Sequence, residues 1–70
     1  MTLSIEEKQS LIGQHQRSME LNKYNLELAL IQENALTSPN ASTVSSLQDQ
    51  ISDCDKKLTA LANELSQLNS

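Results

Sequence analysis

Thr37-Ser38-Pro39-Asn40-Ala41-Ser42-Thr43 divides this chain of 70 residues into two segments that each read as one long helix. Pro39 disfavours helical geometry at Ser38 and removes a backbone donor, so the first helix is expected to end near Leu36 or Thr37. The cap of the second helix stays open between Ser38, Asn40 and Ser42. Two long helices with a short connection pack antiparallel, so the sequence predicts an all-α two-helix hairpin.

The outer boundaries of the hairpin follow from local helix signals. Ser4 stands three residues before Glu7, which is the spacing of a capping box, in which each residue bonds to the other's backbone amide. From Ile5 to about Leu36 only Gly13 opposes helix formation, at a cost of about 1 kcal/mol. We therefore expect one domain over residues 1–70, with a helix over about 5–36, a turn over about 37–42 and a helix over about 43–69.

The composition excludes several classes of function. One cysteine cannot form an internal disulfide, and one histidine with one cysteine cannot form a four-ligand zinc site. A single tyrosine, without phenylalanine or tryptophan, provides no platform on which bases can stack. No nucleophile with a neighbouring base and no glycine-rich phosphate loop is visible. The sequence therefore predicts a protein that is not an enzyme and that holds no metal or cofactor.

The expected location is the cytoplasm. The N-terminus has neither a basic region nor an apolar region of the kind found in signal peptides. The longest unbroken apolar run is 28–31, whereas a membrane-spanning helix needs about 20 residues. The lone Cys54 is typical of a reducing compartment.

The second helix carries one regular apolar stripe. Its members alternate spacings of three and four, which is the pattern of the a and d positions of a coiled coil. They are Val44, Leu47, Ile51, Cys54, Leu58, Leu61, Leu65 and Leu68. The flanking positions are polar, so this narrow stripe predicts contact with one neighbouring helix.

The first helix carries two apolar stripes on nearly opposite sides. One consists of Ile5, Ile12, Met19 and Leu26, widened by Leu11, Ala29 and Leu30 and interrupted by Lys8, His15 and Asn22. The other consists of Leu21, Tyr24, Leu28, Ile31 and Ala35. A helix with two apolar sides needs two neighbours, and the second helix of the same chain covers only one. Which stripe meets the second helix stays open at this stage.

The second stripe of the first helix, Leu21 to Ala35, is the predicted partner-binding surface. Leaving Leu21, Leu28 and Ile31 in water would forgo about 1.5–3 kcal/mol for each side chain. Tyr24 is typical of interfaces because it combines apolar area with a polar tip. The alternative is that these residues only broaden the core within the chain.

A second copy of the chain or a heterologous helical protein is the expected partner. Two copies joined in this way would form a homodimeric four-helix bundle. Polar interruptions at Lys8, His15 and Asn22 would select the partner, and Asn22 in a seam could also fix register. The primary prediction is thus a protein–protein interaction module without membrane attachment.

Two narrower functions are alternatives. In size and helix arrangement the chain is similar to small acidic hairpins that act as co-chaperones for needle subunits of bacterial type III secretion systems. A dimeric helical hairpin that binds RNA, as in a plasmid copy-number regulator, is the other alternative. Nucleic acid is disfavoured because the net charge is -4 and the basic residues do not gather on one face. Those residues are Lys8, Arg17, Lys23, Lys56 and Lys57.

Overall fold

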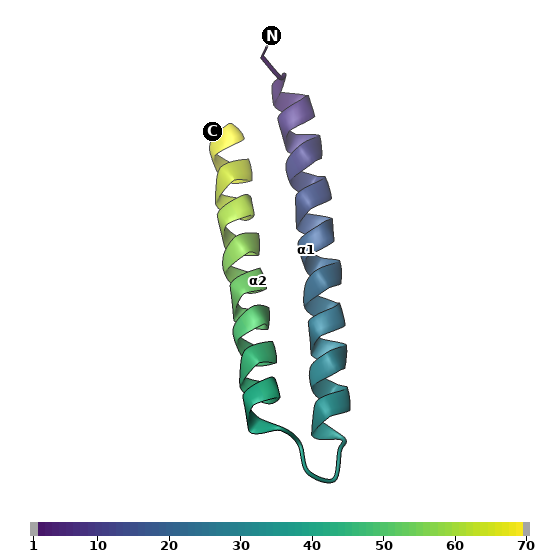
Figure 1. The fold of residues 1–70 in the computed structure, drawn as a ribbon. Coiled ribbons are helices and arrows are strands. Elements are labelled where there is room, and N and C mark those ends of the chain that lie inside the picture. The colour runs from purple at the N-terminus through teal and green to yellow at the C-terminus, as the bar shows by residue number, and fades with distance from the viewer. Residues whose placement is uncertain (1, 70) are drawn as a thin grey trace.

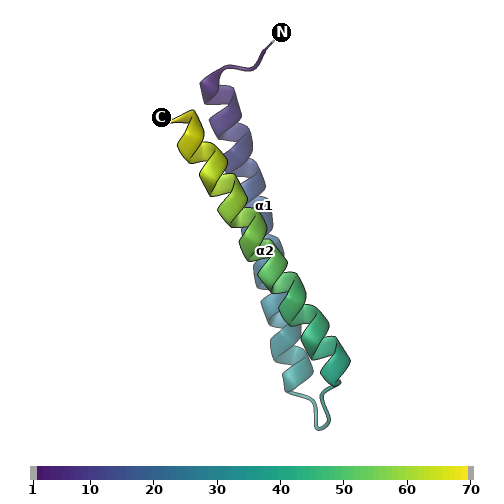
Figure 2. The ribbon, with the colours of Figure 1, turned by 90° about the vertical axis from the view of Figure 1, so that its left-hand side faces the viewer.

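The computed structural model describes residues 2–69, and within that range the chain forms two α-helices and no strand. Helix α1 spans Ile5–Asn34 and helix α2 spans Ala41–Leu68. The helices lie side by side and antiparallel, with both chain ends at one end of the rod and the connection at the other (Figures 1 and 2). The rod measures 55 × 18 × 15 Å. The predicted all-α hairpin is confirmed.

The first turn of α1 is held by the predicted capping box. The Ser4 hydroxyl accepts a hydrogen bond from the Glu7 amide at 3.1 Å, and the Glu7 carboxylate accepts one from the Ser4 amide at 3.0 Å. These bonds satisfy two backbone groups that a helix start otherwise leaves without a partner. The bond from the Ser4 amide, and after it the Ser4 hydroxyl, lower the pKa of Glu7, because they stabilise its charged carboxylate.

The connection between the helices begins and ends earlier than the sequence predicted. Helix α1 ends at Asn34, two residues before the expected Leu36, because the amide of Leu36 turns back onto the Glu33 carbonyl in a tight final turn. Helix α2 begins at Ala41 rather than near residue 43, because Asn40 is its N-cap and accepts a bond from the Thr43 amide at 3.0 Å. The Glu33 carboxylate also accepts a bond from the Asn40 amide at 3.0 Å, which ties the connection to α1.

The two helices meet along one line of side chains, which we call the seam. On α2 the seam is the predicted stripe, and every residue of that stripe is buried or half-buried while the rest of α2 is exposed. On α1 the seam positions also alternate spacings of three and four, and they too are buried or half-buried. They are Gln9, Ile12, Gln16, Met19, Lys23, Leu26, Leu30 and Glu33.

The seam buries little of the molecule. Among the described residues only Ile12 and Cys54 are buried, at 8% and 4% exposure, and no side chain there is fully enclosed. A contact between two helices leaves most of each helix in water, so a hairpin of this length has a thin core. Small proteins with thin cores commonly gain further stability from association.

Candidate functional site

The outer face of α1, which we define as Leu21, Tyr24, Leu28, Ile31 and Ala35, is the predicted partner-binding surface, and it lies away from α2. Leu21 is 52% exposed, Tyr24 59% and Ile31 63%. Leu28 is half-buried and Ala35 is exposed. Of the first stripe of α1, Ile12, Met19, Leu26, Ala29 and Leu30 are buried or half-buried, whereas Ile5 and Leu11 are exposed, contrary to the prediction. The first stripe therefore meets α2 from Ile12 onward, and the outer face is left in solvent.

Helix geometry explains why α2 does not cover the outer face. At 100° per residue, the centre of the outer face lies about 145° around α1 from the centre of the seam. A single helix packed against α1 contacts only the side that it faces. Leu21, Tyr24 and Ile31 therefore do not broaden the core within the chain, which was the alternative to a partner-binding surface.

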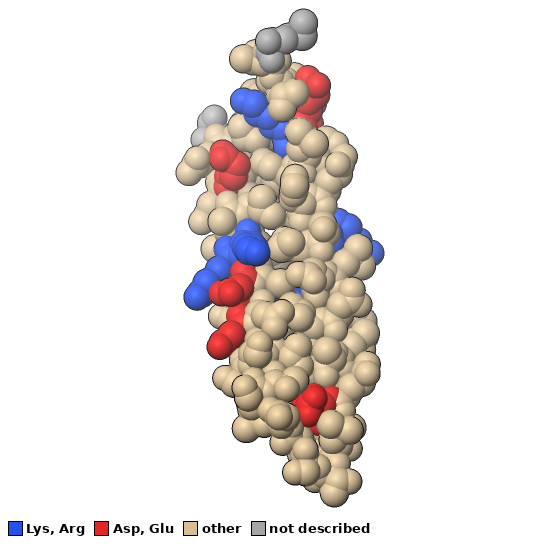
Figure 3. All heavy atoms as spheres, in the orientation of Figure 1, with Lys and Arg blue, Asp and Glu red and all other residues tan. Residues whose placement is uncertain are grey.

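Uncharged surface surrounds the C-terminal half of the outer face, from Leu28 to Ala35. Between residues 28 and 48 the sequence contains one charged residue, Glu33, and that residue lies on the seam side, bonded to Asn40. Figure 3 shows the consequence in one view, where the half of the molecule nearest the connection is largely free of charged atoms. An apolar strip in neutral surroundings is a surface from which water is easily displaced.

The polar residues predicted to interrupt the seam lie beside it instead. Lys8, His15 and Asn22 are exposed, and each stands one residue before a seam position. One residue rotates a helix by about 100°, which turns these side chains from the seam to its edge. Asn22 still reaches inward, because its side-chain amide donates to the Cys54 sulfur at 3.6 Å. That Lys8, His15 and Asn22 select the partner stays a prediction.

The polar residues that do occupy the seam are Gln9, Gln16, Lys23 and Glu33. The sequence analysis did not predict these residues, because the predicted stripe follows apolar residues spaced by seven and leaves out the polar positions between them. A strict alternation of three and four carried backward from Leu30 passes through Lys23 and Gln16, so that signal was present in the sequence. Gln9 donates to the Asn69 side chain at 2.6 Å and so joins the two ends of the hairpin.

Lys23 is the charged residue at the centre of the α1 seam. Its Nζ lies 2.7 Å from an Asp55 carboxylate oxygen on α2 and 4.0 Å from Glu27 on its own helix. The hydrogen bond and the charge of Asp55 raise the pKa of Lys23, and the charge of Glu27 adds to this. Because the pKa is raised on folding, the contribution to stability is complete below the ordinary lysine pKa and is lost as the pH rises through the raised value.

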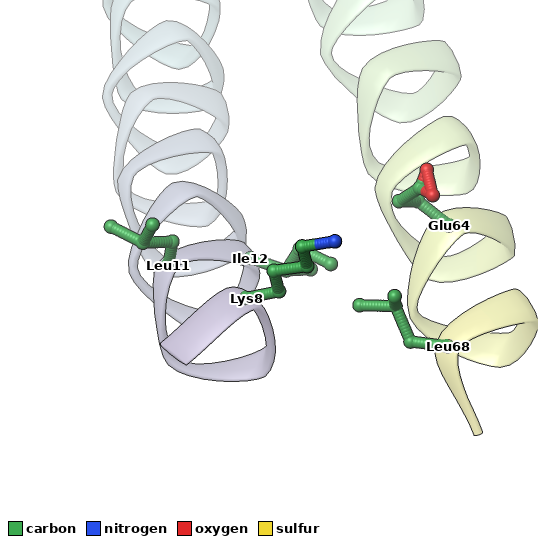
Figure 4. A pocket seen from close by; sticks show the side chains of 5 residues that line it. All are labelled: Lys8, Leu11, Ile12, Glu64 and Leu68. Atoms are coloured by element: carbon green, nitrogen blue, oxygen red, sulfur yellow. The ribbon is translucent and has the colours of Figure 1, made fainter. Parts of the chain in front are cut away.

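The open end of the hairpin has a second, smaller apolar feature. Lys8, Leu11, Ile12, Glu64 and Leu68 line a shallow groove between the helix ends (Figure 4). Ile12 and the stem of Lys8 point toward α2, whereas Leu11 points away from it. Leu3 and Ile5, at the N-terminal end of α1 near this groove, are 49% and 54% exposed. The groove has a cationic and an anionic rim residue but no cluster of groups that could perform chemistry.

Titratable side chains are not gathered anywhere in residues 2–69 in a way that could hold a metal ion. The one thiol, Cys54, is buried in the seam as a small apolar residue and forms no disulfide. Over the same residues, neither helix is long and apolar enough to cross a membrane.

Comparisons with known protein families, with curated proteins and with solved structures find no match to this chain. The assignment of function therefore rests on the hairpin itself: its seam, its outer face and the charges around them.

Proposed function

We propose that the protein is a non-enzymatic interaction module that binds a protein through the outer face of α1. The observation that supports this is the exposure of Leu21, Tyr24 and Ile31 on one side of a helix whose opposite side is already packed. Full burial of an exposed side chain gains about 1.5–3 kcal/mol, and these side chains, which are 52–63% exposed, would gain somewhat more than half of that at an interface. Tyrosine within an apolar strip is also typical of the residues that dominate binding energy.

The charges of the hairpin support a protein partner over a nucleic acid. Lys23 is engaged by Asp55 and Glu27, and Lys56 lies 4.0 Å from Asp53. Cations already beside carboxylates are poor phosphate contacts, and RNA binding needs several free cations on one surface. We keep the cytoplasm as the proposed location, because the buried Cys54 is a free thiol.

A matched pair of lysine substitutions tests the proposal. Ile31→Lys places a charge in the outer face, and Ser52→Lys places the same charge on an exposed position of α2 away from the seam. The expected result is that Ile31→Lys loses every protein bound by the wild type, including other copies of the chain, while Ser52→Lys retains them. Helix content by circular dichroism checks that both variants fold.

Two results would contradict the proposal. If Ile31→Lys retains the partners of the wild type, the outer face is not the binding surface. If the wild type instead binds structured RNA with an affinity that falls steeply with salt concentration, the protein belongs to the RNA-binding class.

A further inference from the structure

We infer that the occupant of the outer face is a second copy of this chain, bound so that the two α1 helices run antiparallel with a two-fold axis near residue 26. This inference rests on the proposed function and names its partner. It is carried by the spacing of the apolar residues on the outer face, by the position of Arg17, and by the missing cation in the last turn of α1.

The outer face is complementary to itself when it is reversed. Its apolar residues alternate spacings of three and four, as the a and d positions of a coiled coil do, and an antiparallel pair aligns each a position with a d position of the other helix. With the axis near residue 26, Leu21 lies opposite Ile31 of the second copy, and Tyr24 lies opposite its Leu28. The two-fold axis repeats both layers, so every layer from residue 21 to residue 31 pairs apolar with apolar.

Arg17 distinguishes the antiparallel arrangement from the parallel one. It stands four residues before Leu21, so it continues the outer face toward the N-terminus, and it is exposed. In a parallel pair Arg17 would face Arg17 of the second copy, which places like charges together. In the antiparallel pair it faces Ala35 of the second copy, at the C-terminal end of that α1.

The C-terminal end of α1 is a suitable site for a cation from outside. The last carbonyls of a helix carry a partial negative charge that lysine or arginine side chains stabilise. The last turn of α1 contains no basic residue. Arg17 of the second copy would supply that charge, and the two-fold axis makes the contact twice.

One like-charge contact opposes this dimer. Glu27 lies on the edge of the outer face close to the axis, where it approaches Glu27 of the second copy. Lys23 stands 4.0 Å from Glu27 and offsets part of its charge. Removing this charge should therefore tighten the dimer, which distinguishes this register from others.

The dimer would be a row of four helices rather than a square bundle. Because the seam and the outer face lie about 145° apart around α1, the second copy packs on the side of α1 opposite to α2. The order across the assembly is α2, α1, α1 of the second copy and its α2. An interface formed by about 21 Å of one helix lies at the small end of specific interfaces, so the dimer is expected to dissociate on dilution.

Light scattering combined with a spin-label distance tests the inference. The wild-type mass should rise toward twice 7.7 kDa with concentration. In a Cys54→Ala background, a label on Ser18→Cys should report a separation of about 25 Å, because the two labels are offset by about 16 residues along the helices. A parallel pair would bring the labels to about 10 Å, the spacing between packed helices, and would overturn the proposed orientation.

Charge variants sharpen the test without disturbing the apolar layers. Arg17→Glu should weaken the dimer by about tenfold, and Lys56→Glu, which makes the same change of charge on α2, should leave it unchanged. Glu27→Gln should tighten it several-fold. Equal affinities for Arg17→Glu and Lys56→Glu would contradict the contact with the helix end.

The outcomes separate this inference from the proposed function. A wild type that stays at 7.7 kDa at every concentration overturns the second copy as occupant, yet a heterologous partner lost on Ile31→Lys would still support the interaction module. A dimer that survives Ile31→Lys overturns both, because association then uses another surface.

Discussion

The two helices of the hairpin form the same seam with different patterns of residues. Helix α2 puts an apolar residue at every seam position, and its only apolar residues outside the seam are alanines. Helix α1 alternates apolar residues with Gln9, Gln16 and Lys23 in its seam and places apolar residues on its other side. The apolar surface in the seam is therefore continuous on α2 and interrupted by polar residues on α1.

This difference separates what holds the hairpin together from what is available for a partner. In α2 nearly all apolar residues are used by the seam, so α2 contributes stability and little else. In α1 the seam takes Ile12, Met19 and Leu26, and the outer face keeps Leu21, Tyr24 and Ile31 in solvent. A helix that only had to complete a hairpin would concentrate its apolar residues on one side.

The largest effect is expected from a pair of isoleucines on the two sides of α1. Ile12→Ala should destabilise the hairpin by about 2–3 kcal/mol, because Ile12 is 8% exposed in the seam. Ile31→Ala should change the stability of the monomer by less than about 0.5 kcal/mol, because Ile31 is 63% exposed. Urea denaturation of dilute protein measures both. Equal losses would show that the two sides of α1 do not differ as described.

A pair of glutamines tests whether polar residues weaken the α1 seam. Gln16→Leu should stabilise the hairpin by about 1 kcal/mol, because it adds half-buried apolar surface between Ile12 and Met19. Gln14→Leu, at an exposed position two residues away, is the control and should have little effect. Thermal unfolding at matched concentrations compares them. A loss of stability in Gln16→Leu would mean that the glutamine makes a favourable contribution at this position.

Gly13 provides a smaller test of the difference between the helices, since α2 contains no glycine. A Cβ atom added at Gly13 would meet nothing within 4 Å, and its φ angle is not positive. Gly13→Ala should therefore stabilise α1 by about 0.5–1 kcal/mol through a less flexible unfolded chain. Unfolding by urea measures the gain. No gain or a loss would indicate that this position of α1 contacts something other than solvent.

The smallest expected effect concerns acid pH and the two helix starts. The pKa of Glu7 is lowered in the folded chain, so the cap stabilises α1 above the ordinary glutamate pKa and is lost as the pH falls through the lowered value. Ser4→Ala should reduce this acid dependence in part, because it removes the Ser4 hydroxyl, which contributes to the lowered pKa of Glu7, and keeps the Ser4 amide, which donates to the carboxylate and contributes more. Helix content followed through an acid titration measures the slope.

Asn40→Ala is the matched control for the acid titration. It removes the N-cap of α2, whose first turn has no acidic residue, so it should lower stability while keeping the slope of the wild type. If Ser4→Ala and the wild type lose helix content in parallel, the Ser4 hydroxyl does not contribute to the acid dependence.

Local signals predicted most of the fold. The capping box at Ser4, the break around Pro39 and the regular stripe of α2 were readable because each depends on neighbours within a few turns. The ends of the connection were predicted less well, since the choice of Asn40 as cap also involves Glu33, seven residues away. The outer face was predicted as a set of residues, and the seam of α1 only in part.

By itself, the sequence determined that this chain forms two helices, where α1 starts and which side of α2 is apolar, because helix periodicity and capping act over short distances. Only the tertiary structure decided which of the two apolar sides of α1 meets α2, and that Lys23 rather than Asn22 lies in the seam. Both sides of α1 carry enough apolar surface to pack, so composition does not choose between them. The choice depends on how the whole length of α1 aligns with α2, including the pairing of Lys23 with Asp55 and of Gln9 with Asn69.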